Sequence, residues 1–215
     1  WERVIPPITA NRGSFIRVFF ADFNNDGKLE IAAPNKGDQS EVKAAEKNHP
    51  ISWFEINGDP LDGDSWIEHE LTRVIVPENS RPADLDGDGD LDILGASRGE
   101  GRIMWFENLG TDPISFKEHA INAMEDGAPY PITGVNVDFY DFSQDGRLDI
   151  VVYQSPDKRK FGWIEQPDNF EKPWIVHPIG HTLPDMLIGV VVADINSDGN
   201  PDVMIGTYSG GPRDK

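Results

Sequence analysis

The sequence predicts an all-β protein assembled from a repeated sheet of four strands, and three observations support this. Apolar stretches are short, rich in Val, Ile, Phe and Trp, and bounded by Gly, Pro, Asn and Asp, as in strands joined by turns. No long stretch carries the 3.6-residue apolar period of a helix, and the best helix candidate is the short segment Glu41–Lys47. The third observation is an internal repeat.

The repeat begins with an acidic loop that occurs four times. The first aspartates of these loops are separated by 62, 57 and 53 residues; they are Asp22, Asp84, Asp141 and Asp194. A fixed period of this length is typical of repeat architectures, so the loops indicate four copies of one supersecondary unit.

Two further stretches recur between the loops. A Trp-bearing stretch occurs three times, at Ile51–Ile56, Ile103–Asn108 and Phe161–Gln166. A stretch that contains histidine follows each of them, at Trp66–Leu71, Phe116–Ile121 and Trp174–Ile179. Each repeat therefore reads as a strand, the acidic loop, a second strand, the Trp-bearing strand and a closing strand.

Four strands in each repeat of this length predict the blades of a β-propeller. We expect residues 1–215 to form a single propeller of about four blades, or part of a larger one. Three repeats are complete, and the fourth lacks its Trp-bearing strand. The segment Trp1–Pro6 resembles a closing strand and could complete that blade. Alternatively, further blades follow Lys215, or the open edge accepts a strand from a neighbouring subunit.

The composition restricts the partners of the chain. Its 38 acidic and 19 basic residues give a net charge of −19, which repels nucleic acid and anionic membranes, so neither is an expected partner.

The absence of cysteine excludes disulfides, thiolate metal sites and thiol nucleophiles. No apolar run is long enough to span a membrane, and no signal peptide is visible. The first residue, Trp1, suggests a mature, trimmed or partial product.

Each acidic loop follows the pattern D-x-[DNS]-x-D-G-x-x-[DE], in which oxygen-bearing side chains occupy alternate positions. Hard oxygen ligands suit Ca²⁺, and we expect up to four ions, one in each loop. The expected side-chain ligands are Asp22, Asn24, Asp26 and Glu30; Asp84, Asp86, Asp88 and Asp92; Asp141, Ser143, Asp145 and Asp149; and Asp194, Asn196, Asp198 and Asp202. The expected backbone carbonyl ligands are those of Lys28, Asp90, Arg147 and Asn200.

A glycine at the sixth position of every loop permits the positive φ that returns the last carboxylate to the ion. An EF-hand is excluded because loop position 12 is never Glu and because each loop runs directly into β-type sequence. Mg²⁺ fits less well because it demands octahedral geometry and retains water. Four carboxylates in the second loop predict the tightest site there, and Ser143 predicts the weakest site in the third loop.

The loop between β-strands resembles the FG-GAP/VCBS repeat of integrin-α-type propellers and secreted microbial proteins, and VCBS is the closer label. The resemblance covers essentially the whole chain. It implies a secreted or cell-surface propeller with Ca²⁺ held by the oxygen ligands named above. Ser143 and Glu30 depart from the usual pattern of the family.

Two functions are consistent with these features. The first is a non-enzymatic extracellular module for adhesion, ligand binding or assembly, with a protein or glycan ligand and with Ca²⁺ rigidifying the blades. The alternative is a lectin or the propeller domain of a polysaccharide lyase or sugar dehydratase. No catalytic or cofactor-binding set is identified. Candidate ligand-binding segments are the long insertions Pro34–Pro50 and Ala123–Gly134.

The histidines and aromatic residues have structural interpretations. His69, His119 and His177 recur once in each repeat, which is typical of a structural residue and not of a catalytic one. The recurring Trp53, Trp105 and Trp163 are interpreted as core residues between blades. The unrepeated candidates for a lyase base, which we interpret as loop or surface residues, are His49, His181, Tyr130 and Tyr140.

Overall fold

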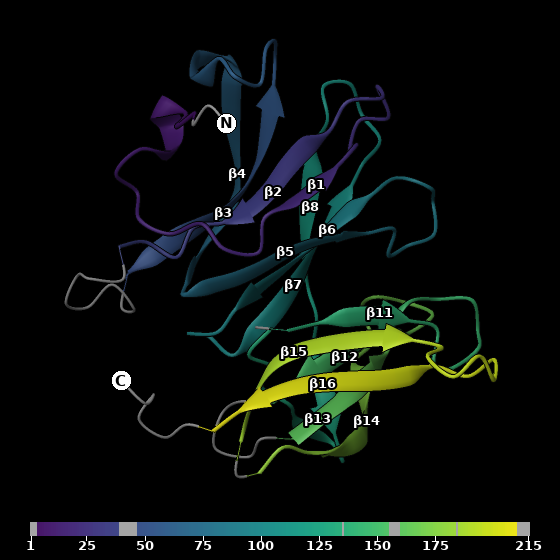
Figure 1. Ribbon diagram of the computed structural model, residues 1–215. Helices are drawn as coiled ribbons and strands as arrows, with labels where there is room; N and C mark the ends of the chain where they lie inside the picture. The colour runs from purple at the N-terminus through teal and green to yellow at the C-terminus, as the bar shows by residue number, and fades with distance from the viewer. Residues whose placement is uncertain (1–3, 39–46, 135, 155–159, 184, 210–215) are drawn as a thin grey trace. The chain divides into compact units, whose positions relative to one another are not determined.

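A computed structural model describes residues 4–38, 47–134, 136–154, 160–183 and 185–209 (Figure 1). The chain is all-β, as predicted: the described residues form four sheets, none of them closed, and two short 3₁₀ turns, Pro7–Thr9 and Gly63–Ser65. The helix candidate Glu41–Lys47 lies outside the described residues except for Lys47, which belongs to no helix. The chain divides into two compact units, residues 1–120 and 121–215, each described by itself.

The first unit contains two antiparallel four-stranded sheets whose strands follow one another in chain order. The first sheet consists of β1 (Phe19–Ala21), β2 (Glu30–Pro34), β3 (Asn48–Ile56) and β4 (Trp66–Ile75). The second consists of β5 (Pro77–Ala83), β6 (Asp92–Ser97), β7 (Arg102–Asn108) and β8 (Phe116–Ala120). Each sheet is one complete repeat with the strand order that the sequence predicts.

The second unit contains the third repeat and the beginning of the fourth. The third repeat is formed by β11 (Asp138–Tyr140), β12 (Asp149–Tyr153), β13 (Lys160–Glu165) and β14 (Trp174–His181). A hairpin of β9 (Ala123–Glu125) and β10 (Ala128–Pro129) extends this sheet to six strands, because β9 pairs in parallel with β14. The fourth repeat has two strands, β15 (Met186–Ala193) and β16 (Asp202–Tyr208).

The apolar core of the first unit joins its two sheets. Ala32 and Trp53 from the first sheet belong to one buried cluster with Ile93, Met104 and Phe106 from the second. Trp53 is therefore a core residue between two sheets, as its recurrence suggested. Close packing of alternating inward side chains holds such sheets face to face.

In the second unit, a similar cluster joins the third repeat to the fourth. Tyr153 and Phe161 from the third repeat pack with Leu187 from β15, and Val203 and Ile205 from β16 pack against them. One face of the two-stranded sheet is thereby covered by its own unit.

The last two strands of each complete repeat are joined by a cross-strand contact between tryptophan and histidine. The two residues are direct partners in the strand register, with ring centroids 4.0 to 4.6 Å apart and the rings nearly parallel. A glutamate two residues after the Trp approaches the imidazole, with Nε2–Oε2 distances of 2.6 to 3.4 Å. The three sets are Trp53–His69–Glu55, Trp105–His119–Glu107 and Trp163–His177–Glu165. This contact accounts for the repeated histidine as a structural residue.

The segment Trp1–Pro6, expected as a closing strand, does not form one where it is described. Trp1–Arg3 lie outside the described residues, and Val4, Ile5 and Pro6 belong to no strand. Pro6 and Pro7 lack backbone N–H groups and cannot donate to a strand ladder, and a 3₁₀ turn begins at Pro7. Within the described part of the chain, no helix is long and apolar enough to cross a membrane.

Candidate metal sites

The four acidic loops occupy equivalent positions in their repeats. Each loop connects the first two strands of its repeat: β1 to β2, β5 to β6, β11 to β12, and β15 to β16. The backbone has a positive φ at the fourth and sixth positions of every loop. The sixth position is always Gly, while the fourth is Asn25, Gly87, Gln144 or Ser197. The four loops therefore adopt the same backbone conformation although their sequences differ.

The first aspartate of each loop holds this conformation. Its two carboxylate oxygens accept hydrogen bonds of 2.8 to 3.1 Å from the backbone N–H of the sixth position and of the fourth or fifth position. The fifth-position aspartate accepts a bond of 2.8 to 2.9 Å from the N–H of the seventh position. These local bonds fold the loop around its own carboxylates, as Asx turns do.

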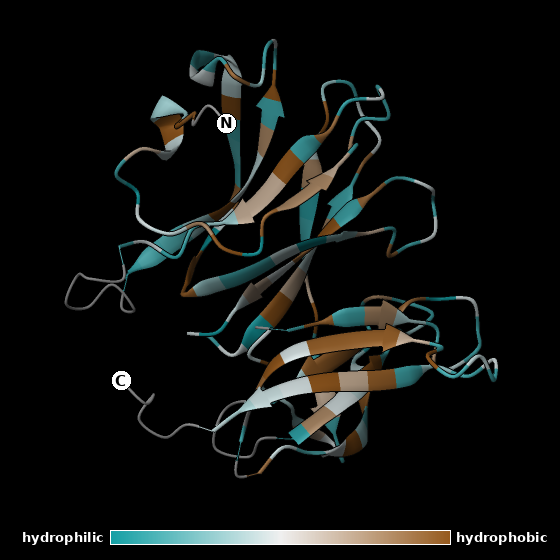
Figure 2. Cartoon of the chain, viewed as in Figure 1, coloured by the Kyte–Doolittle hydropathy of each residue, from teal (hydrophilic) through white to brown (hydrophobic). Residues whose placement is uncertain are grey.

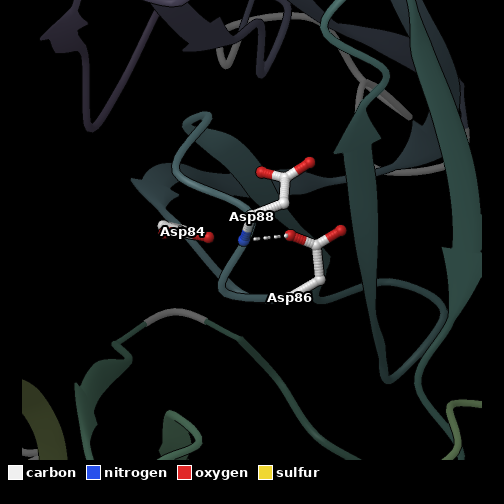
Figure 3. A group of neighbouring side chains, drawn as sticks. All are labelled: Asp84, Asp86 and Asp88. Atoms are coloured by element: carbon white, nitrogen blue, oxygen red, sulfur yellow. Dashed lines mark hydrogen bonds between the residues drawn. The ribbon is translucent and has the colours of Figure 1, made fainter.

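The second loop brings three carboxylates together (Figure 3). Asp84, Asp86 and Asp88 each offer an oxygen, and the three oxygens lie within 4.8 Å of one another. Among the described residues, no other group of three acidic or histidine side chains approaches so closely. Oxygens bound to one Ca²⁺ at 2.3–2.6 Å can be at most about 5 Å apart, so this geometry fits the ion.

The electrostatics of this cluster favour a cation. The side chain of Asp86 is exposed, but partial desolvation within the loop, followed by the negative charges of Asp88 and Asp84, raises its pKa. A divalent cation among the three carboxylates would reverse the effect of their mutual repulsion.

The ninth-position acids are held by the backbone. Asp92 is fully buried; its Oδ2 accepts from Leu85 N at 2.8 Å and its Oδ1 from Asn108 N at 2.8 Å. Asp149 accepts from the backbone N–H groups of Phe142, Ser143 and Gln166 at 2.9 Å. In both loops, therefore, the carboxylate ties the loop to the end of the third strand.

The other two ninth-position acids have only loop donors in the described contacts. Glu30 is buried and accepts from Phe23 N at 2.8 Å. Asp202 is half-buried and accepts from Ile195 N at 2.9 Å and Asn196 N at 3.4 Å. All four acids thus hold the second residue of the loop, and none of them belongs to the close group of Asp84, Asp86 and Asp88.

Burial raises the pKa of Asp92, Glu30 and Asp149 at the ninth position of their loops. It raises the pKa of Asp92 to about 7, against the opposing effect of the two backbone N–H donors. Burial likewise raises the pKa of Glu30 and of Asp149. A buried ionised carboxylate is costly unless a charge compensates it, and a cation in the loop would provide that compensation.

The seventh-position side chain differs among the loops. Lys28 Nζ lies 3.4 Å from Asp26 Oδ2, Arg147 pairs with Asp145, and Asn200 Nδ2 donates to Asp198 Oδ1 at 3.0 Å. In the second loop this position is itself acidic. Asp90 Oδ1 accepts a hydrogen bond of 2.8 Å from Asn25 Nδ2, which links the first loop to the second.

A second link between these two loops passes through Asn108, at the end of β7. Its buried side-chain amide donates to Phe23 O at 2.8 Å and to Leu91 O at 3.2 Å. The sequence analysis missed Asn108, because its position at the end of a strand gives no signal of a contact with another repeat. It also missed the positive φ at the fourth position, which only Asn25 and Gly87 suggest by residue type.

The residues considered as a lyase base lie in different settings. Tyr130 is buried, and burial together with the charge of Glu125 raises the pKa of its phenol, which makes it a poor base at neutral pH. His181 is exposed at the end of β14. His49 is half-buried in β3, and Tyr140 packs beside Phe142 with ring centroids 5.3 Å apart.

The two candidate ligand-binding segments are described to different extents. In Pro34–Pro50, residues 39–46 lie outside the described part of the chain. In Ala123–Gly134, the β9–β10 hairpin forms an added edge of the third sheet, with Ala128 and Pro129 exposed.

A comparison with known families identifies the repeat. A family model described as FG-GAP-like repeat matches residues 84–152 and 141–205, and the two matches together cover more than half of the chain. Each match begins at one acidic loop and ends in the strand that follows the next acidic loop. It therefore contains the spacing between two loops as well as the loops themselves. No curated protein matches the chain.

Proposed function

The chain belongs to the family of FG-GAP-like repeat proteins, and from this premise we propose that it is an extracellular, calcium-binding β-propeller module for adhesion, ligand binding or assembly. In this proposal each acidic loop binds one Ca²⁺ through the residues named above. The bound ion fixes the turn between the first two strands, so that the turn and its blade form one rigid unit.

The observation that carries the proposal is the group formed by Asp84, Asp86 and Asp88. Three carboxylates within 4.8 Å repel one another, and their loop nevertheless has a conformation shared with three other loops. A bound cation removes the repulsion and gives a reason for the conserved geometry of the repeat within this chain.

The propeller part rests on the sheets. Two complete four-stranded sheets of the first unit pack through one buried cluster, as adjacent blades do. The extracellular part of the proposal rests on the resemblance of the repeats to those of secreted and cell-surface propellers, and extracellular calcium modules bind the ion with affinities of about 10⁻⁴–10⁻³ M.

Thermal unfolding with and without calcium tests this function. The protein is melted in excess Ca²⁺, in EDTA, and in Mg²⁺ at the same ionic strength. Calcium at a hundredfold excess over its dissociation constant should add about 2.7 kcal/mol of stability for each site. Equal melting temperatures in Ca²⁺ and EDTA would contradict the proposal.

The ligand part needs a separate experiment. A glycan array probed in Ca²⁺ and again in EDTA should give calcium-dependent binding if a rigid module presents a glycan surface. Replacing the exposed hairpin residues at positions 126–128 by a shorter turn should weaken that binding without changing the melting temperature in calcium. Turnover of an acidic polysaccharide would favour the enzymatic alternative instead.

A further inference from the structure

Strand β5 is hydrophilic in sequence but buried in the first unit. Figure 2 shows hydrophilic residues along most of it, and Glu78, Asn79 and Ser80 are 2%, 2% and 0% exposed. Glu78 is also the extra residue of a β-bulge, because Pro77 pairs with Ser97 and Asn79 with Ala96. A bulge re-aims a side chain and is frequent beside functional sites. The structure therefore invests a buried carboxylate and an irregular strand in one place.

Three cations surround the Glu78 carboxylate. Lys36 Nζ lies 2.6 Å from Oε1, Arg98 Nε lies 2.9 Å from the same oxygen, and Arg17 Nη1 lies 3.1 Å from Oε2. The three come from separate segments, before β1, after β2 and after β6. Even without Lys36, the two arginines carry more positive charge than one carboxylate balances. Surplus positive charge beside a buried group is costly, and this chain has 38 acidic and only 19 basic residues.

The two guanidinium groups have unused hydrogen-bond donors. Arg98 donates to Glu78 through Nε alone, and Arg17 donates through Nη1 alone, to the carboxylate and to the carbonyl of Glu78. Their other N–H groups have no acceptor among the described residues. The nearby Glu100 is already paired with Arg102 at 2.6 Å. The Arg17 and Arg98 side chains are 28% and 48% exposed, and a guanidinium edge matches the two oxygens of a carboxylate.

The backbone around this cluster is held in uncommon conformations. Val76 has φ of 51° and Arg17 has φ of 46°, and a positive φ is a genuine outlier for a β-branched residue. The Val76 carbonyl accepts from Arg98 N at 3.0 Å. Gly99 packs so closely that a Cβ on it would lie 2.4 Å from Ile75 Cγ2. Strain of this kind is concentrated at ligand sites, and here it fixes Arg98 beside Glu78 in advance.

A pocket of about 250 Å³ adjoins the cluster along the chain, because Asn35 and Gly37, the neighbours of Lys36, line it. Asn35 Oδ1 accepts from Gly37 N at 2.7 Å, and its Nδ2 has no acceptor among the described residues. The two arginines of the pocket each pair with a glutamate; the pairs are Arg12–Glu68 and Arg73–Glu70. Amide groups suit the hydroxyl groups of a sugar, so the pocket complements the charged cluster with neutral hydrogen bonding.

We propose that Arg17 and Arg98, with Lys36 beside them, bind the carboxylate of a uronic acid unit in an acidic glycan. Glu78 is the positioning residue that gathers the cations, and the pocket beside Lys36 accommodates hydroxyl groups of the same glycan. The ligand carboxylate supplies the negative charge that the cluster lacks. The inference rests on the glycan-binding part of the proposed function, to which it adds a site and a chemical class of ligand.

The acidic loops do not repel such a ligand strongly. Lys36 and Arg98 follow the ends of β2 and β6, whereas the acidic loops precede these strands. A strand of five residues, the length of β2, spans about 17 Å at about 3.3 Å per residue. Screening at physiological salt acts over about 8 Å, so the negative loops are largely screened at the cluster.

Calorimetric titration of the full chain with trigalacturonate in Ca²⁺ tests the site. We expect binding, and Arg98→Gln should weaken it about tenfold. Lys36 and Arg17 remain on Glu78 in this variant, and its melting temperature in calcium checks that it is folded. Arg98→Lys keeps the charge and loses the planar fork, so its loss should be smaller. The matched control is Lys117→Gln, which removes one positive charge from β8 and should leave the affinity unchanged.

Other probes test the class of ligand. Maltotriose, a neutral trisaccharide, should not bind. Tighter binding of triglutamate or of a sulfated galactan oligosaccharide than of trigalacturonate would overturn the assignment. No binding at millimolar trigalacturonate, or equal affinities of Arg98→Gln and the wild type, would overturn the site itself.

The calcium sites are measured separately. If the protein binds trigalacturonate but melts at the same temperature in Ca²⁺ and EDTA, the glycan site stands and the calcium part of the proposed function fails. If calcium raises the melting temperature and trigalacturonate does not bind, the glycan site fails alone.

Discussion

The second and fourth acidic loops have the same backbone and different surroundings. In both, the first aspartate accepts two backbone hydrogen bonds and the fifth aspartate accepts one. The second loop belongs to a complete repeat, and its ninth residue, Asp92, is 0% exposed and bonded to the end of the third strand. The fourth loop has no third strand among the described residues, and its ninth residue, Asp202, is half-buried.

This difference separates local from non-local contributions. The nonapeptide folds its own turn, because the turn has positive φ angles at the same positions in the second loop and in the fourth, whose repeat has no third strand among the described residues. Burial of the ninth carboxylate, the raised pKa of Asp92 and its bond to Asn108 require the later strands. Loop geometry is therefore a property of the motif, whereas the burial and the non-local hydrogen bond of the ninth carboxylate depend on the rest of the repeat.

The largest expected effect concerns the ninth position. Asp92→Ala leaves two backbone N–H groups, those of Leu85 and Asn108, without an acceptor in a buried site. We expect a loss of about 3 kcal/mol in the free energy of unfolding, because each buried unsatisfied donor costs about 1–3 kcal/mol. Asp202→Ala is the matched variant and should cost less than about 1 kcal/mol, since water can replace the carboxylate there.

Urea unfolding of both variants in calcium measures the difference. Equal losses in the two variants would show that the later strands of the repeat add nothing to the role of the ninth carboxylate.

The next effect concerns the number of carboxylates. Asp86→Asn in the second loop reduces four to three, and Asn196→Asp in the fourth loop raises three to four. We expect the first change to weaken calcium binding about tenfold and the second to strengthen it about tenfold, or about 1.4 kcal/mol each. Isothermal titration calorimetry of the two variants and the wild type checks this. If the second loop still binds calcium more tightly than the fourth after these two substitutions, burial and not the number of carboxylates determines the order of affinities.

The smallest effect concerns the link between the first two loops. Asn25→Gly retains the positive φ at the fourth position and removes the hydrogen bond to Asp90. Ser197→Gly is the control, because it makes the same backbone change in a loop without such a link. We expect Asn25→Gly to weaken calcium binding in the second loop about threefold, less than 1 kcal/mol, and Ser197→Gly to leave it unchanged. Equal calcium affinities of the second loop in both variants, measured by calorimetry, would show that the hydrogen bond from Asn25 to Asp90 does not contribute to binding there.

Much of this fold could be predicted because its signals are local. The acidic nonapeptide, the Trp-bearing strand and the histidine in the closing strand each recur at fixed offsets, so all-β structure and the strand order of three repeats follow from the pattern. The loop glycines predict the turn at the sixth position. Among the described residues, the fourth repeat contributes the strand pair β15–β16 that flanks its acidic loop.

The contacts that escaped prediction are those between repeats or those without a residue signal. Gln144 and Ser197 have positive φ although neither residue type favours it, because the bonds to the first aspartate impose the turn. The insertion at Ala123–Gly134 joins the third sheet through a parallel pairing that no spacing rule indicates. The link from Asn108 to Phe23 depends on how two sheets pack, which one strand cannot specify.

The stacked rings of Trp53, Trp105 and Trp163 on His69, His119 and His177 give the chain an intrinsic optical reporter in each complete repeat. Separation of the third and fourth strands of a repeat would end this ring contact and change the surroundings of the indole, so a change in tryptophan emission would report on that strand pair without any attached dye.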